Sequence, residues 1–332
     1  MRISSFEYLE PQTVQEACKL LSEYDGTAKI IAGGTDLLVM MKQRVCTPQY
    51  LINIKKIKDL DSIKYDETDG LKIGCLTTLN AIAGHGLVQK HYKALSQGAV
   101  SVASPNIRNL ATIGGNLCLD AKCWYYNQSP LFRKGRDADY KSGGNICYVV
   151  KKGKSCYALV TADTIPALIA LDAEATIASK DGRHSVPVEK FFTGQGDPPN
   201  VLGSGEMVAE IHIPISAPNT FSAFLKESFR GSIEFGIANV AVAITFNPSD
   251  GVCKAARIAL SSVTCAPVNA QKAARLLEGK KIDAELAAEA AKAAVSEAGP
   301  ISSIWTSVYH RRNVIQSLVK KAIIQTIDEA SQ

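Results

Sequence analysis

The sequence predicts an α+β protein, with helical and strand patterns that alternate along the chain and end in a sheet covered by helices. Near the N-terminus, residues 13–24 carry apolar side chains at helical spacing, and short apolar runs at 29–32 and 50–54 predict strands. Toward the C-terminus, long strand-like runs at 237–246 and 253–263 precede three helical patterns. This order favours helices packed on one face of an antiparallel sheet.

The remaining elements are placed by periodicity and by start signals. Thr13 followed by Glu16 three residues later is the capping-box pattern of a helix that begins there. In the middle of the chain the patterns predict strands at 71–73, 158–160, 167–171 and 175–178, and helices at 79–85 and 92–101. In the last third they predict helices at 269–277, 284–298 and 308–330.

Composition is that of an ordinary globular protein of two or three domains. The chain has 332 residues, 46% of them hydrophobic and 21% charged, with a net charge of +5. No apolar run is long enough to span a bilayer, and the first residues show no secretory pattern. Nine cysteines, an odd number, argue against a disulfide framework. We therefore expect a cytoplasmic protein without a membrane span and without a nucleic-acid partner.

Two short apolar runs break into paired glycines followed by small polar residues. The first, at 30–38, reads Ile-Ile-Ala-Gly-Gly-Thr-Asp-Leu-Leu, and the second, at 111–116, reads Ala-Thr-Ile-Gly-Gly-Asn. Glycine tolerates positive φ and close approach, so such turns let backbone N–H groups converge on an anion. Side-chain hydrogen bonds to that anion are expected from Thr35, Asp36, Thr112 and Asn116.

Two glycine turns about eighty residues apart suit a long bisphosphate ligand. Neither turn has the G-x-G-x-x-G spacing of a Rossmann dinucleotide site, and neither is a P-loop. A hydride-transferring enzyme on a Rossmann fold is therefore disfavoured.

Five motifs follow in order along the chain, at 6–11, 32–37, 73–78, 104–116 and 205–214. Together they resemble the FAD-binding medium subunit of the molybdenum hydroxylases, the family of xanthine dehydrogenase and carbon monoxide dehydrogenase. The resemblance covers essentially the whole chain. It implies an FAD-binding fold of the vanillyl-alcohol-oxidase/PCMH type. That fold forms two N-terminal subdomains, at 1–58 and 59–216, and the resemblance implies that an α+β C-terminal domain of the carbon monoxide dehydrogenase flavoprotein type follows it at 217–332.

In this family the two glycine turns hold the pyrophosphate of FAD, and a lysine matching Lys226 lies beside the flavin. The FAD-binding residues that the resemblance implies are Ile31, Ala32, Gly33, Gly34, Thr35, Asp36, Leu37, Ala103, Ile107, Ala111, Thr112, Gly114, Gly115, Asn116, Met207 and Lys226.

An insert at about 118–157 carries four of the nine cysteines, Cys118, Cys123, Cys147 and Cys156. Its periodicity is poor, which indicates a loop excursion held together by something other than a hydrophobic core. Thiolates bind iron–sulfur clusters and zinc well, but no C-x-x-C pair occurs, so a zinc ribbon is disfavoured. A metal centre and free thiols in a structured loop both remain open.

Parts of the insert, at 123–129, 133–134, 147–150 and 156–158, resemble the flavin subunit of 4-hydroxybenzoyl-CoA reductase. That resemblance implies an extra 4Fe–4S cluster with four cysteine ligands, three of which match Cys123, Cys147 and Cys156. The fourth falls near Asp139, where this chain has no cysteine. Three outcomes stay open: a cluster with Asp139 as its fourth ligand, a cluster that recruits Cys118, and an insert that has lost its cluster.

The resemblance implies an electron-transfer subunit that works with a molybdopterin-binding large subunit and a 2Fe–2S small subunit. With a cluster beside the FAD, ferredoxin would feed electrons inward, as in a 4-hydroxybenzoyl-CoA reductase-like enzyme. Without it, NAD(P) or a quinone would take electrons from a xanthine, aldehyde or carbon monoxide dehydrogenase-type hydroxylase. No catalytic acid or base is predicted, because no suitable constellation of side chains emerges. A flavin-free scaffold subunit and a stand-alone FAD oxidase are the opposing interpretations.

Overall fold

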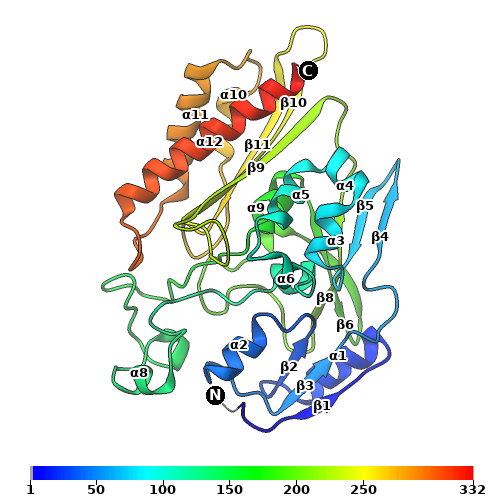
Figure 1. Cartoon of the computed structure of the whole chain (residues 1–332), viewed down its shortest axis with the longest axis vertical. Coiled ribbons are helices and arrows are strands. Elements are labelled where there is room, and N and C mark those ends of the chain that lie inside the picture. Colours follow the sequence, from blue (N-terminus) through cyan, green and yellow to red (C-terminus); the bar gives the residue numbers. More distant parts are fainter. Residues whose placement is uncertain (1–2, 332) are drawn as a thin grey trace.

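The computed structural model describes residues 3–331, which form three sheets that follow one another along the chain (Figure 1). In the view of Figure 1 the N-terminal sheet lies at the bottom, a five-stranded sheet lies in the middle, and a four-stranded sheet with its helices lies at the top. The predicted α+β class is confirmed. Within the described residues, no helix combines the length and apolar character needed to cross a bilayer.

The N-terminal unit is a parallel sheet in the order β1-β3-β2. Its elements are β1 (Glu7–Leu9), α1 (Val14–Glu23), β2 (Ala28–Ile31), α2 (Leu37–Lys42) and β3 (Tyr50–Asn53). Thr13 caps α1 as predicted, because its Oγ1 accepts from the backbone N–H of Glu16 at 3.1 Å. The Glu16 carboxylate accepts from the N–H of Gln12, one residue earlier than a capping box requires. The short helix α2 was not predicted, and it starts directly after the first glycine turn.

The middle unit is an antiparallel sheet in the order β4-β5-β8-β6-β7. Its strands are β4 (Ile63–Asp66), β5 (Gly70–Gly74), β6 (Glu174–Ser179), β7 (Gly182–Pro187) and β8 (Met207–Ile213). Its helices are α3 (Leu79–Gly84), α4 (Gly86–His91), α5 (Lys93–Val100), α6 (Pro105–Arg108), α7 (Ile113–Leu117) and α9 (Thr164–Ala170), with a 3-10 turn at Val188–Lys190.

Two of the predicted strands in this unit are wrong. The run at 167–171 belongs mainly to α9, every residue of which is buried. A helix buried on all sides has no polar face, so its short apolar run looks the same as a buried strand. The run at 158–160 forms only an isolated bridge, in which Leu159 pairs with Lys122.

The C-terminal unit is an antiparallel sheet in the order β12-β11-β10-β9, with three helices on one face (Figure 1). Its elements are β9 (Thr220–Glu227), β10 (Ala238–Phe246), β11 (Cys253–Ser261), β12 (Val268–Asn269), α10 (Gln271–Leu277), α11 (Ala284–Ala298) and α12 (Val308–Ala330). Buried alanines along α11 let that helix pack closely. The sheet also meets the middle unit, because the N–H of Phe224 donates to Oε1 of Gln97 at 2.7 Å.

The insert contains α8 (Pro130–Lys134) and a 3-10 turn at Tyr140–Ser142. Half-buried aromatic rings cluster within it, in keeping with the expectation that the insert has no buried hydrophobic core of its own. The rings of Trp124 and Phe132 meet edge to face at 5.4 Å, and the Arg136 guanidinium lies 4.6 Å from the Phe132 ring centre. The insert also contacts the N-terminal unit, because the Tyr126 hydroxyl donates to the carbonyl of Val45 at 3.3 Å.

Candidate functional site

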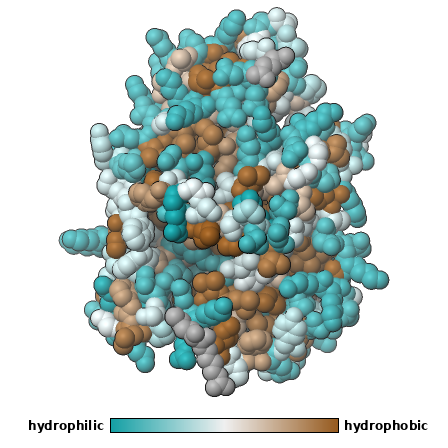
Figure 2. Space-filling view, in the orientation of Figure 1, coloured by the Kyte–Doolittle hydropathy of each residue, from teal (hydrophilic) through white to brown (hydrophobic). Residues whose placement is uncertain are grey.

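A cavity of about 800 Å³ lies where the N-terminal unit, the middle unit and the loop after β9 meet. It is lined by all of the predicted FAD-binding residues except Ile31 and Lys226. In Figure 2 hydrophobic side chains gather at the lower centre of the visible face, around the position of α2. The volume lies within the range that cofactor sites usually have.

The first glycine turn presents a run of free backbone donors to this cavity. Gly34 has φ +71°, a left-handed conformation that favours glycine. In the part of the chain that the structure describes, the N–H groups of residues 33–36 donate to no protein acceptor. Four successive unpaired N–H groups on a cavity wall are suited to bind an anion, as the sequence predicts for this turn.

Gly33 is needed for a different reason, namely the close approach of the two glycine segments. A Cβ at Gly33 would overlap the carbonyl oxygen of Leu110, which directly precedes the second segment. Gly114 is similarly confined, because its Cβ would lie 2.7 Å from the Cβ of Cys75. Glycine therefore lets the first turn rest against the backbone of the second.

The second glycine segment is not a turn with free amides, which corrects part of the prediction. It forms the helix α7, capped by Thr112, whose Oγ1 accepts from the N–H of Gly115 at 3.2 Å. The N–H of Gly114 donates to the carbonyl of Cys75 at 2.9 Å, and the N–H of Asn116 donates to the carbonyl of Thr112. The amides of this segment are thus used within the protein, so its contribution to a ligand comes from side chains.

Two side chains on the cavity wall, one of them from this segment, have polar groups without a protein partner. Asn116 accepts from the Thr164 hydroxyl at 2.6 Å through Oδ1, and its amide nitrogen has no partner among the described residues. The buried Thr161 hydroxyl lines the cavity and, within residues 3–331, also lacks a partner. Buried polar groups are nearly always hydrogen-bonded, so the Thr161 hydroxyl fits a polar ligand in the cavity, and the half-buried Asn116 amide is available to the same ligand.

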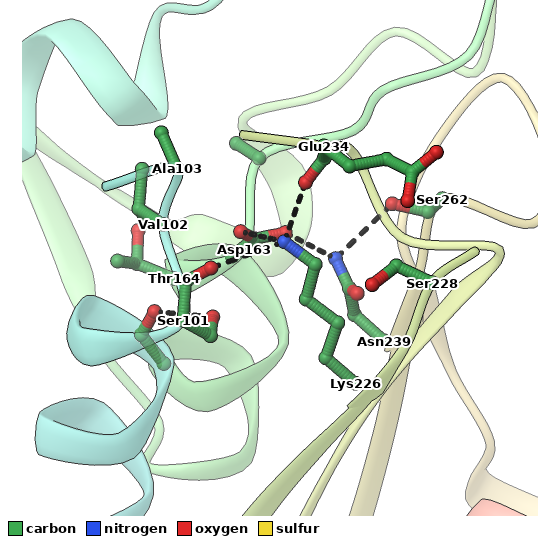
Figure 3. A network of polar contacts seen from close by, with 12 residues as sticks. Ser101, Val102, Ala103, Asp163, Thr164, Lys226, Ser228, Glu234, Asn239 and Ser262 are labelled. Atoms are coloured by element: carbon green, nitrogen blue, oxygen red, sulfur yellow. Dashed lines mark hydrogen bonds and ion pairs between the residues drawn. The ribbon is translucent and has the colours of Figure 1, made fainter. Parts of the chain in front are cut away.

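Lys226 is not among the residues that line the cavity. It belongs to a network of polar contacts with Asp163, which does line it (Figure 3). Its Nζ lies 2.7 Å from Oδ2 of Asp163 and donates to the carbonyl of Glu234 at 2.8 Å and to that of Ser101 at 3.1 Å. Asp163 itself lines the cavity, and Nδ2 of Asn239 donates to its other carboxylate oxygen at 2.8 Å. Burial raises the pKa of Asp163 to about 6, against the lowering effect of Lys226.

The loop after β9 closes the cavity from the C-terminal side. The N–H of Ile233 donates to the carbonyl of Ala103 at 3.0 Å, and the Ser232 hydroxyl donates to the same oxygen at 3.2 Å. Ala103 has φ +44°. The sequence analysis missed Thr161, Asp163 and this loop, because no local pattern marks residues that come together only through the tertiary fold.

The predicted metal ligands do not form a recognisable metal site. Among residues 3–331, no group of three or more His, Cys, Asp or Glu side chains lies close enough together to hold a metal ion. Asp139 caps the 3-10 turn by accepting from the N–H of Ser142 at 3.0 Å. Cys118 lines the cavity. The set of Cys123, Asp139, Cys147 and Cys156 therefore stays a prediction, and no chemistry is derived from it.

The cavity thus has the volume of a cofactor site and is lined by a turn of unpaired amides and by polar side chains. The chain matches the family model described as "FAD binding domain in molybdopterin dehydrogenase" over residues 4–216. Residues 223–326 match "CO dehydrogenase flavoprotein C-terminal domain". The chain therefore belongs to the family of FAD-binding subunits of molybdopterin-dependent dehydrogenases.

Relatives cover nearly the whole chain. The nicotinate dehydrogenase FAD-subunit of Eubacterium barkeri is 27% identical over 98% of both chains, and the carbon monoxide dehydrogenase medium chain of Hydrogenophaga pseudoflava is 28% identical over 96% of both. A solved structure of the Hydrogenophaga pseudoflava carbon monoxide dehydrogenase matches with a TM-score of 0.81 at 27% identity, over 97% of each chain. Quinoline 2-oxidoreductase from Pseudomonas putida 86 also matches, with a TM-score of 0.81 at 26% identity over the full length of both chains.

Proposed function

We propose that this chain is the FAD-binding electron-transfer subunit of a molybdenum hydroxylase-type dehydrogenase, related to those that act on carbon monoxide, xanthine or nicotinate. The observation that carries this proposal is the cavity, in which unpaired amides at residues 33–36 face the same space as Asn116 and Thr161. The family membership and the dehydrogenase relatives support it.

In this proposal the first turn holds the pyrophosphate of FAD, and the Asn116 amide nitrogen and the Thr161 hydroxyl donate hydrogen bonds to the bound cofactor. Asp163 and Lys226 hold the loop after β9 against the segment at 101–103 and so close this side of the cavity. Bound FAD supplies the capacity to exchange electrons in pairs or singly. Ile31 supports the site from the core, packed with Met41 and Leu51.

We place the chain in an assembly with a molybdopterin-binding large subunit and a 2Fe–2S small subunit. Support comes from relatives whose names include "medium chain" or "FAD-subunit". Substrate chemistry would occur on the large subunit, and electrons would leave through the flavin to NAD(P) or a quinone. The division into 1–58, 59–216 and 217–332 is part of this proposal.

The second candidate is a 4-hydroxybenzoyl-CoA reductase-like subunit with a 4Fe–4S cluster in the insert, fed by ferredoxin. One observation favours it: the Cys147 and Cys156 sulfurs accept from the backbone N–H groups of Val150 at 3.4 Å and Ala158 at 3.5 Å. Such bonds stabilise thiolates and so suit a cluster ligand. The hydroxylase-type function is the better supported of the two, because the relatives that match nearly the whole chain are subunits of nicotinate and carbon monoxide dehydrogenases.

Quantified flavin tests the main proposal directly. We expect the purified protein to be yellow, with about one FAD per chain after extraction and no covalent attachment, because the cavity offers one site of cofactor size. Acid precipitation followed by chromatography of the supernatant measures both quantities. A protein that purifies colourless and binds no added FAD would instead be a scaffold subunit.

Iron content separates the two candidate functions. We expect the double variant Cys147→Ala/Cys156→Ala to contain as much iron and acid-labile sulfide per complex as the wild type, because the main proposal places no cluster in this subunit. Both proteins are purified without oxygen and analysed side by side, with Asp139→Ala as a third sample. A loss of about four irons and four sulfides in the double variant would favour the reductase-like function.

A further inference from the structure

The insert places a lysine on the carboxylate of the first glycine turn. Nζ of Lys122 lies 2.6 Å from Oδ1 and 2.7 Å from Oδ2 of Asp36. The Lys122 side chain is 15% exposed and that of Asp36 is 34% exposed, so bulk water only partly screens the pair. The backbone of Lys122 is fixed as well, because its N–H and carbonyl both pair with Leu159, at 2.8 and 2.9 Å, at the base of the insert.

The Lys122–Asp36 ion pair compensates an unfavourable negative charge in the site. The unpaired amides at residues 33–36 attract an anion, but Asp36 adds a negative charge to the same turn, on the wall of the same cavity. A carboxylate beside a diphosphate opposes binding by Coulomb repulsion, which is strong where water is partly excluded. Lys122 neutralises the charge of Asp36, so the turn then attracts an anion through its amide donors without an opposing negative charge.

The insert provides a second pair of the same kind. Lys141 and Asp120 both line the cavity, and Nζ of Lys141 lies 2.7 Å from Oδ1 of Asp120. The Lys141 side chain is only 5% exposed. Asp120 belongs to the insert too, so Lys141 compensates a carboxylate that the insert itself brings to the cavity wall, whereas Lys122 compensates one from the first glycine turn.

We propose that the insert is a charge-neutralising wall of the flavin site, in which Lys122 pairs with Asp36 so that the first turn accepts the diphosphate of FAD. Lys122 is a positioning residue that acts through Asp36. This inference rests on the proposed function, and it gives the insert a role that requires no metal cluster.

The test is an FAD titration of the full-length protein after removal of its flavin, in which the quenching of flavin fluorescence reports binding. Lys122→Met leaves Asp36 uncompensated, so we expect the Kd for FAD to rise about tenfold or more at low salt. The rise should shrink in 1 M salt, because screening weakens the repulsion. Lys154→Met, which removes an exposed lysine of the same insert, is the matched control and should leave the Kd within about twofold.

A charge-rescue variant distinguishes neutralisation from simple damage to the fold. Lys122→Met/Asp36→Asn removes both charges, and it should recover most of the affinity that Lys122→Met loses. Thermal unfolding of each variant shows whether the insert remains folded. An unchanged Kd in Lys122→Met, or a double variant as weak as the single one although folded, would overturn the inference. A wild-type protein that binds no FAD would overturn the proposed function itself.

Discussion

Replacing Gly33 with alanine is expected to abolish stoichiometric FAD binding. A Cβ at this position would overlap the carbonyl oxygen of Leu110, and a backbone atom cannot move aside as a flexible side chain can. The first turn would have to withdraw from the second glycine segment, which separates the free amides at 33–36 from Asn116. We expect at least about a hundredfold rise in the Kd for FAD and a stability loss of about 1–3 kcal/mol, the usual cost of overpacking.

Gly84→Ala is the matched control for this substitution. Gly84 ends α3, a Cβ there meets nothing within 4 Å, and its φ is not positive. The same chemical change should therefore be neutral, or stabilising by up to about 1 kcal/mol through the unfolded state. Flavin content and thermal unfolding of the two variants are measured together. Stoichiometric flavin in Gly33→Ala would refute the assignment of the first turn to the pyrophosphate.

Elements with strong local signals were predicted closely from the sequence. The bounds of α11 and α12 agree with the prediction, because each helix begins after a capping side chain. Asp283 accepts from the N–H of Leu286 at 2.8 Å, and Ser307 accepts from that of His310 at 3.1 Å. The first glycine turn was likewise predicted, since its glycines and polar residues are contiguous.

Features that depend on tertiary contacts were missed. The helix α9 was predicted as a strand because burial on all sides removes the polar face that identifies a helix. Asp163 and Lys226 are 63 residues apart, and Lys122 and Asp36 are 86 apart, so no periodicity or spacing joins them. The amides of the second glycine segment were assumed to be free because its sequence resembles the first, but Thr112 caps a helix there.

Substituting Lys226 with methionine is expected to destabilise the protein by about 3–5 kcal/mol at neutral pH, the usual result of removing one partner of a buried ion pair. Asp163 would remain buried without its cation, and the carbonyls of Ser101 and Glu234 would lose their donor. These bonds hold the segment at 101–103 to the loop after β9, so FAD affinity should fall as well. Lys226→Met/Asp163→Asn should recover part of the stability, because it removes the uncompensated carboxylate.

The effect of Lys226→Met should depend on pH in a predictable direction. Burial raises the pKa of Asp163 to about 6 from an ordinary value of 3.8, so this group lowers wild-type stability as the pH rises from about 4 to 6. Without Lys226 that pKa rises further, and the loss extends above pH 6. The difference in the free energy of unfolding between wild type and variant should therefore be largest near pH 8 and shrink below about pH 6. Urea unfolding at pH 5 and pH 8 measures it, and a difference that is equal at both values would show that the Asp163 carboxylate does not carry the effect.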